Sequence, residues 1–216
     1  MTEQITMAEF SSASGVEQWR VLAFGACAHW RTGSFAAGVR LIDEIGRLAD
    51  AADHHPDVDL RYGGVTVRLF THETMGLTRR DLDLARQISA AARDLGIAAD
   101  PGAVQDVNIT VDAIGSATVM PFWRAVLGYD ARGDEDLVDP LGRWPGFWFQ
   151  AMDAPRPGRN RIHVDLFVPH DVAEARIAAA LAAGGRLVSD DRAPTWWTLA
   201  DPEGNEVDVA TWQGRD

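Results

Sequence analysis

The stretch DHHPDVDLRYGGVTVRLFTHETMGLTRRD, residues 53–81, decides the fold of the first half of the chain. Apolar and polar residues alternate along residues 65–72, which places one set on each face of a strand. Pro56 ends a preceding helix, because proline disfavours helical backbone in the residue before it. Thr78 and Asp81 have the spacing of a capping box, so a second helix begins there. The stretch therefore predicts a strand between two helices.

The flanking residues extend this pattern to a compact α+β unit. Strand-like residues run from Trp19 to about Arg31 and are broken near Gly25. After Ser34 an apolar period of three or four predicts a helix, with Phe35, Val39, Ile42, Ile45 and Ala49 in phase. The helix that Thr78 opens repeats this spacing at Leu82, Ala85, Ile88, Ala92 and Leu95. Gly96 is its predicted stop.

Three histidines, His54, His55 and His72, are the candidate catalytic residues. Imidazole changes its charge near neutral pH, so clustered histidines suit proton transfer. Two of them lie at a helix-to-strand corner and the third at a strand end, from which they can flank a small planar substrate. On residue type alone, surface or satisfied core histidines and a helix C-terminal cap stay open as alternatives. A metal site is a third alternative, but no carboxylate or thiolate has familiar zinc-ligand spacing.

The order HHP, tyrosine, alternating valines, TH and GLTxxD resembles the signature of the pterin-4a-carbinolamine dehydratase family, over roughly residues 7–95. The resemblance implies an antiparallel four-stranded sheet with helices on one face, in a domain predicted at residues 1–98. It also implies a lyase that dehydrates a 4a-hydroxytetrahydropterin to quinonoid dihydropterin and requires no cofactor. Val58 stands where many members carry an aromatic residue, and Asp50 where many carry Glu, so the identity of the pterin stays open.

The same resemblance implies roles for individual residues by their place in the motif. His54 and His72 match the acid/base histidines, and His55 matches the one that positions the substrate. Asp50 and Asp81 are assigned with it to substrate binding. Some family members act as dimerisation partners of transcription factors, but a pure scaffold has no need of all three histidines.

The second half of the chain contains a degenerate repeat. Each copy has a strand, an apolar helix and an Asp-Pro-x-Gly turn, at residues 107–112, 122–127 and 139–142 and again at residues 161–168, 171–183 and 201–204. Asp-Pro-x-Gly suits a type I turn, and its recurrence in the same order of elements predicts a duplicated module. Residues 96–105 have the composition of a linker and are the predicted domain boundary.

Residues 104–216 resemble the glyoxalase-like branch of the vicinal-oxygen-chelate superfamily. The resemblance rests on FWRAVLG at residues 122–128, NRIHVD at residues 160–165 and DPEGN at residues 201–205. It implies a pair of βαβββ modules whose cup-shaped sheet carries metal ligands on its concave face.

Matching by position gives Gln150, His163 and Asp208 as metal ligands, with Asp106 as a weaker fourth. Imidazole, carboxylate and amide donors suit a divalent ion such as zinc, nickel, manganese or iron. We expect weak or no metal in the purified protein. A small-molecule pocket lined by tryptophans is the alternative, and those tryptophans are equally suited to a core.

Composition and charge exclude several classes of partner. The 216 residues carry a formal net charge of -12, which argues against nucleic acid and anionic membrane surfaces as partners. The single cysteine, Cys27, fits a reducing compartment. No basic segment is followed by an apolar run near residue 1, and no stretch approaches the length of a membrane span, so we expect a soluble cytoplasmic protein.

The sequence therefore predicts two α+β domains and a pterin lyase, with a small-molecule pterin as substrate. Both resemblances imply a homo-oligomer. The alternative is a glyoxalase-like metal-dependent enzyme, or a small-molecule-binding protein, whose N-terminal domain is a non-catalytic dimerisation module.

Overall fold

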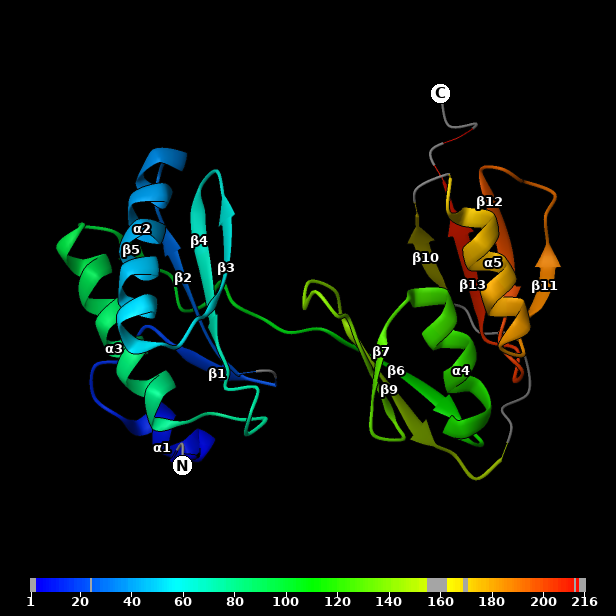
Figure 1. Cartoon of the computed structure of the whole chain (residues 1–216), viewed down its shortest axis with the longest axis horizontal. Helices are drawn as coiled ribbons and strands as arrows, with labels where there is room; N and C mark the ends of the chain where they lie inside the picture. Colours follow the sequence, from blue (N-terminus) through cyan, green and yellow to red (C-terminus); the bar gives the residue numbers. More distant parts are fainter. Residues whose placement is uncertain (1–2, 24, 155–162, 169–170, 212, 214–216) are drawn as a thin grey trace. The chain divides into compact units, whose positions relative to one another are not determined.

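The chain forms two compact units, Met1–Asp106 and Val107–Asp216 (Figure 1). The computed structural model describes residues 3–23, 25–154, 163–168, 171–211 and 213. Both units mix helices with antiparallel strands, as the sequence predicts. None of the helices in these ranges combines the length and apolar character that crossing a bilayer requires.

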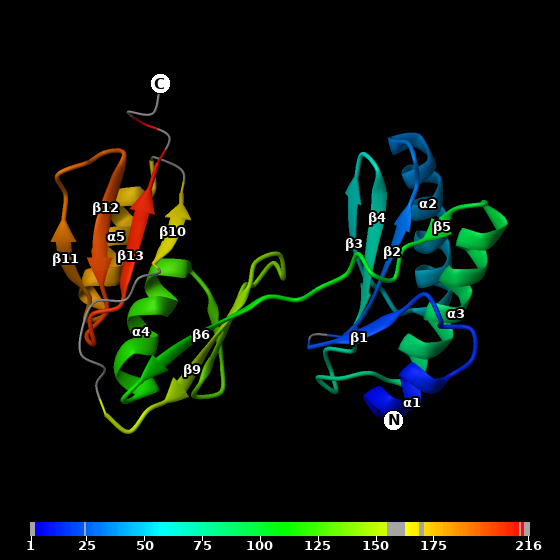
Figure 2. The same cartoon turned by 180° about the vertical axis from the view of Figure 1, so that it is seen from behind.

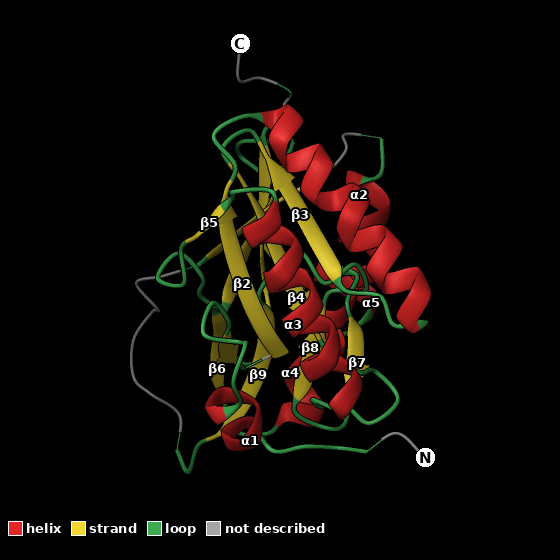
Figure 3. Cartoon of the chain, turned by 90° about the vertical axis from the view of Figure 1, so that its left-hand side faces the viewer, coloured by secondary structure: helices red, strands yellow, loops and turns green. Residues whose placement is uncertain are grey.

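Unit 1 is a sheet with its helices on one face. Its elements are α1 (Met7–Ser12), β1 (Arg20–Leu22), β2 (Gly25–Arg31), α2 (Phe35–Ala52), β3 (Asp57–Arg61), β4 (Gly64–Leu69), α3 (Arg79–Asp94) and β5 (Ala98–Ala99). The four predicted strands run antiparallel in the order β1-β2-β4-β3. Figures 1 and 3 show α2 and α3 side by side on one face of this sheet.

The predicted linker contributes a fifth strand to this sheet. β5 lies within residues 96–105 and pairs with β2, where Ala99 and Ala98 oppose Trp30 and Arg31. β1 pairs with the other end of β2, so the two short strands share one edge of it. The unit therefore continues beyond the boundary predicted at residue 98.

Local sequence signals set the helix ends of unit 1. The Ser34 hydroxyl accepts from the backbone N–H of Ala37 at 3.2 Å and caps α2. That helix ends at Asp53, whose φ of 48° is left-handed and turns the chain toward the histidine pair. Asp81 accepts from the backbone N–H of Thr78 at 2.7 Å, which confirms the predicted capping at the start of α3.

The core of unit 1 lies between its sheet and its helices. Val65, Val67 and Leu69 have no exposed surface, so the predicted inward face of β4 is confirmed. The predicted face of α2 is partly wrong. Phe35 and Val39 are 50% and 39% exposed, and the buried positions of the helix are Ala37, Gly38, Leu41, Ile45 and Ala49.

Unit 2 consists of the two predicted βαβββ modules. The first has β6 (Asn108–Ala113), α4 (Ser116–Leu127), β7 (Asp130–Arg132), β8 (Asp136–Val138) and β9 (Gly146–Ala151). The second has β10 (Val164–Phe167), α5 (Ala173–Ala182), β11 (Arg186–Ser189), β12 (Trp196–Ala200) and β13 (Glu206–Ala210). The sheets have matching orders, β6-β9-β8-β7 and β10-β13-β12-β11, and in each the first strand is parallel to the last.

Unit 2 buries one face of its strands under its helices and leaves polar residues on the other. A single core joins the modules through α4, α5 and the apolar residues of β6, β9, β12 and β13. Along β10, Val164 and Leu166 pack against this core, whereas Asp165 and Phe167 are exposed. Figure 2 shows the face of β10, β12 and β13 opposite α5. Residues 161 and 162, which the sequence placed in this strand, lie outside the described residues.

Candidate functional site

His54 follows α2 and is bound to a buried carboxylate. Its Nε2 lies 2.7 Å from Oδ1 of Asp81, in the first turn of α3. His54 is 8% exposed and Asp81 has no exposed surface. A carboxylate cannot donate, so the Nε2 atom of His54 carries the hydrogen and donates it. The burial of Asp81 does not fit the prediction that it binds substrate directly. Instead it orients His54.

The second ring nitrogen of His54, Nδ1, takes no part in the hydrogen bond to Asp81. Within the described residues, the buried side-chain nitrogen or oxygen atoms without a hydrogen-bond partner belong to Gln18 and Thr32. His54 Nδ1 is therefore not an enclosed, unpaired atom. In a neutral imidazole that donates through Nε2, Nδ1 is an acceptor and can take up a proton.

His55 lies beside His54 but points to solvent. Its Nε2 is 3.0 Å from Oδ1 of Asp50, near the end of α2, and the two side chains are 62% and 81% exposed. An exposed pair of this kind contributes little to stability. Both side chains are thus accessible from solvent, and the substrate contacts assigned to them stay a prediction.

His72 lies in the turn that joins β4 to α3. The turn is closed by Thr71 and Gly76, which exchange backbone hydrogen bonds of 2.9 and 3.3 Å. His72 is exposed, and its ring meets that of Phe70 edge to face with centroids 5.5 Å apart. Thr71 is bound to Asp81 through its hydroxyl at 2.6 Å. One carboxylate therefore connects His54 to the base of the turn that carries His72.

Sequence reasoning missed two threonines at this site. Thr71 and Thr78 are buried, and both hydroxyls lie within hydrogen-bond distance of Oδ2 of Asp81. Thr78 was expected only as a helix cap. The alternation along β4 placed Thr71 on the face of Val67 and Leu69, which is the buried face, so the signal for a buried hydroxyl was present.

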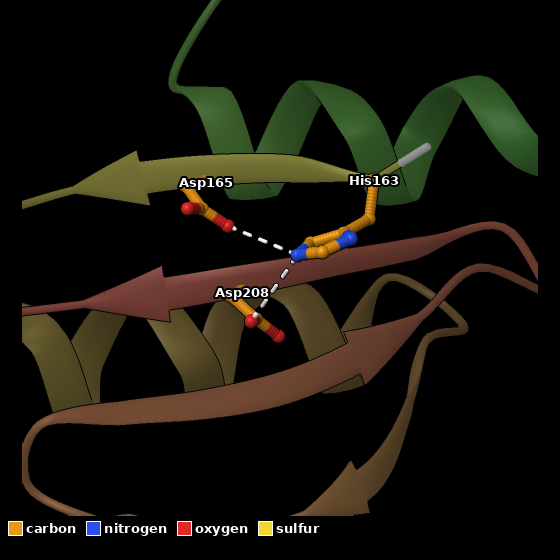
Figure 4. Close-up of side chains that lie close together, drawn as sticks. All are labelled: His163, Asp165 and Asp208. Atoms are coloured by element: carbon orange, nitrogen blue, oxygen red, sulfur yellow. Dashed lines mark ion pairs between the residues drawn. The ribbon is translucent and has the colours of Figure 1, made fainter. Parts of the chain in front are cut away.

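A second cluster of possible ligands lies on unit 2, on the open face of β10 and β13. Figure 4 shows His163, Asp165 and Asp208 converging there. Nε2 of His163 is 3.2 Å from Asp165 Oδ1 and 3.6 Å from Asp208 Oδ2, and the three ligand atoms lie within 4.8 Å of one another. Thr198 of β12 donates to Asp208 Oδ1 at 2.6 Å and fixes that carboxylate. Such donors fit a divalent ion.

The cluster differs from the predicted ligand set. Asp165 was not included, although it shares a strand face with His163. Gln150 is exposed on β9 beside Asp112, and no hydrogen bond within the described ranges ties it to the cluster. Asp106 is 2.8 Å from the Arg68 guanidinium of β4 and its side chain is 11% exposed. It belongs to unit 1 and is paired with Arg68, and its assignment as a fourth ligand stays a prediction.

Family comparisons separate the two units in the same way. The model described as "Pterin 4 alpha carbinolamine dehydratase" matches residues 3–91. The model described as "Glyoxalase-like domain" matches residues 108–210.

Curated relatives match the N-terminal half. A Nocardia farcinica protein provisionally named a pterin-4-alpha-carbinolamine dehydratase is 52% identical over 60 residues, which are 28% of this chain and 63% of that protein. A Mycobacterium leprae protein with the same provisional name is 33% identical over 79 residues, 37% of this chain and 84% of that protein. The chain thus spans less than two thirds of the length of several relatives that it matches.

Among solved structures, one described as a glyoxalase/bleomycin resistance protein/dioxygenase from Alicyclobacillus acidocaldarius is 13% identical. The match covers 51% of this chain and 93% of that one, with a TM-score of 0.38.

Proposed function

The chain belongs to the pterin-4a-carbinolamine dehydratase family and carries a glyoxalase-like domain in its C-terminal half, and on this premise we propose that unit 1 dehydrates a 4a-hydroxytetrahydropterin. The observation that carries the proposal is the shared carboxylate of Asp81. Through its two oxygens it binds His54 and the base of the His72 turn. His54 and the residue before His72 are thereby bound to the same buried carboxylate.

The reaction requires two proton transfers. Hydroxide is a poor leaving group, so an imidazolium donates a proton to the 4a-hydroxyl. The bond between carbon 4a and that oxygen breaks at the same time, and water leaves. The neighbouring ring nitrogen supplies the electron pair and then loses its proton to a base, which gives quinonoid dihydropterin. The substrate and product are at the same oxidation level. Positioned acid–base groups typically contribute about 10²–10⁴ in rate.

The surroundings of each histidine suit a separate task. Asp81 fixes the ring of His54 and stabilises the imidazolium that forms when Nδ1 takes up a proton. His72 is exposed at the tip of its turn, where a ligand can reach either ring nitrogen. His55, with Asp50 beside it, offers an exposed polar pair for binding a pterin.

A direct assay with a 4a-hydroxytetrahydropterin tests this proposal. We expect His54→Ala and His72→Ala each to lower kcat by about 10²-fold or more, the contribution of one acid or base. We expect His55→Ala mainly to raise KM. His29→Ala is the matched control, because His29 pairs with Thr66 on the sheet and has no proposed role. Full activity in a His54/His72 double variant would refute the assignment.

A second proposal concerns unit 2. We propose that His163, Asp165 and Asp208 hold a divalent cation weakly, with water completing its coordination. All three side chains come from the second module, so the site does not depend on Asp106. When bound, such an ion can polarise an oxygen of a small ligand. His163 supplies a nitrogen donor, and Thr198 orients the carboxylate of Asp208.

Elemental analysis and metal titration of protein without a His-tag test the cation site. We expect substoichiometric metal after purification and saturable binding of zinc or manganese that His163→Ala abolishes. His55→Ala, which alters an exposed His–Asp pair in unit 1, is the matched control and should bind as wild type does. Identical binding by the His163→Ala variant would contradict the site. Chelation should leave the pterin reaction unchanged, because the proposed dehydration uses imidazoles alone.

A further inference from the structure

The hydroxyl group of Thr71 links the base of the His72 turn to the carboxylate that binds His54. It donates to Oδ2 of Asp81 at 2.6 Å, while the other oxygen of that carboxylate accepts from His54 at 2.7 Å. Thr71, Asp81 and His54 are 4%, 0% and 8% exposed. A buried polar group without its partner is destabilising, so these contacts hold one another in place.

The hydrogens available at this point fix the direction of each bond. Thr71 Oγ1 and Thr78 Oγ1 lie 2.9 Å apart, and they lie 2.6 and 2.8 Å from Asp81 Oδ2. Each hydroxyl has one hydrogen to donate. The carboxylate oxygen can only accept, so both hydroxyls satisfy it best by donating to it. The short approach of the two hydroxyl oxygens then follows from their shared acceptor.

Because Thr71 directly precedes His72 in the chain, its hydrogen bond to Asp81 bears on where His72 lies. Thr71 closes the turn of residues 71–76 through its backbone pair with Gly76, and His72 is the next residue. Met75 in the same turn has a left-handed φ of 52°, a backbone conformation that residues other than glycine rarely adopt. The turn is therefore held at its base. Thr78 donates to the same carboxylate oxygen from the N-terminus of α3, outside this turn.

We propose that Thr71 is a positioning residue, whose hydroxyl sets the place of His72 relative to His54 through Asp81. The role in catalysis rests on the dehydration proposed above. Thr71 does not itself touch the substrate. Its loss misplaces one of two groups that must act on the same molecule, and misplacement by about 1 Å can cost about 10²-fold in rate.

The primary test compares Thr71→Val with Thr71→Ser in the dehydration assay. Valine keeps the branched shape and removes the hydroxyl, whereas serine keeps the hydroxyl. We expect Thr71→Val to lower kcat by about 10-fold to 100-fold while KM changes by less than about threefold. We expect Thr71→Ser to recover kcat to within about threefold of wild type. If Thr71→Val does not fold, Thr71→Ala is used, because a water molecule can then satisfy the carboxylate.

Thr78→Val is the matched control. It removes a hydroxyl from the same carboxylate oxygen but does not loosen the His72 turn, so its kcat should be at least about fivefold higher than that of Thr71→Val. Nitrogen-15 relaxation of the backbone amides of residues 72–75 provides a readout that needs no activity. We expect greater motion of this turn in Thr71→Val, and wild-type behaviour in Thr71→Ser and Thr78→Val.

The two readouts separate the positioning role from the reaction itself. An inactive wild-type protein would refute the proposed dehydration, and the relaxation data would still test the link between Thr71 and the turn. Unchanged relaxation in folded Thr71→Val, or equal losses of kcat in Thr71→Val and Thr78→Val, would overturn the positioning role. A loss in Thr71→Ser as large as that in Thr71→Val would overturn it as well.

Discussion

Asp81 and Asp201 are both fully buried carboxylates. Their hydrogen-bond partners show that Asp81 belongs to the candidate site, whereas Asp201 has a structural role. Asp201 accepts from the indole N–H of Trp123 at 2.9 Å and from Asn205 and Glu203 in its own turn. These amide and indole groups do not ionise near neutral pH. Asp201 therefore fastens its turn to α4. Asp81 differs because one of its donors is an imidazole, a group that changes its charge near neutral pH.

At the same scale, Tyr129 predicts how stability depends on pH. Burial, with a further contribution from the nearby charge of Asp139, raises the pKa of Tyr129 to about 12, and its hydroxyl donates to the carbonyl of Pro145 at 3.2 Å. The phenol of an unfolded tyrosine has a pKa of about 10. Between these values the folded state holds the proton and the unfolded state loses it, so the free energy of unfolding falls as pH rises from about 10 to about 12.

We expect Tyr129→Phe to make this decline less steep, because phenylalanine has no proton to lose. Urea unfolding at several pH values between 9 and about 11.5 measures the slope, with circular dichroism confirming that the protein is folded. The chain has no lysine, which simplifies the comparison in this range. Tyr62→Phe is the control, since Tyr62 is 78% exposed and is the only other tyrosine. Equal slopes in wild type and Tyr129→Phe would contradict the burial of the phenol.

At the scale of the element, α2 shows why a helical period alone does not fix a buried face. The helix carries apolar residues around much of its circumference, at Phe35, Val39 and Ile42 as well as at Leu41 and Ile45. Two apolar stripes therefore satisfy the same spacing. The sheet and α3 select the stripe that includes Leu41. This choice is a property of tertiary packing, which the period of the sequence does not contain.

Substitutions on the two stripes should differ in their cost. Leu41 has no exposed surface, so Leu41→Ala should lower the free energy of unfolding by about 2–5 kcal/mol. Val39 is 39% exposed, and Val39→Ala should change the free energy of unfolding by about 0.5 kcal/mol or less. Urea titration followed by the indole N–H signals of Trp19 and Trp30, which lie in the core of unit 1, measures both. A larger effect from Val39→Ala would support the stripe predicted from sequence.

Other elements show which features local sequence could and could not predict. The duplicated order of strand, helix and Asp-Pro-x-Gly turn was predictable, because these signals are local, whereas the full βαβββ module was implied by the family resemblance. The histidine motif was likewise recognisable, because its residues are close together in the sequence. β5 was not predictable, since Ala98 and Ala99 form a strand only by pairing with β2. Nor was the burial of Asp81, which depends on the packing of α3 against the corner after α2.

At the scale of the whole molecule, the end of unit 1 decides how the chain can be divided. Past residue 98, the backbone N–H of Asp100 donates to the carbonyl of His29 at 2.8 Å. The Asp100 carboxylate also accepts from Arg31, and this hydrogen bond lowers its pKa. Asp106 pairs with Arg68 of β4. Residues 99–106 thus belong to the first unit by contact, although their composition suggests a linker.

The last prediction follows from these contacts. A fragment of residues 1–106 should unfold cooperatively in urea, because its helices and sheet enclose one core. A fragment of residues 1–98 should also fold, but with a free energy of unfolding lower by about 1–3 kcal/mol, since it loses half of β5, the hydrogen bond to His29 and the partner of Arg68. Circular dichroism during urea unfolding compares them, and Asp106→Asn within the longer fragment isolates the ion pair. Equal midpoints for the two fragments would show that residues 99–106 only connect the units, and failure of both to fold would show that unit 1 depends on the glyoxalase-like half.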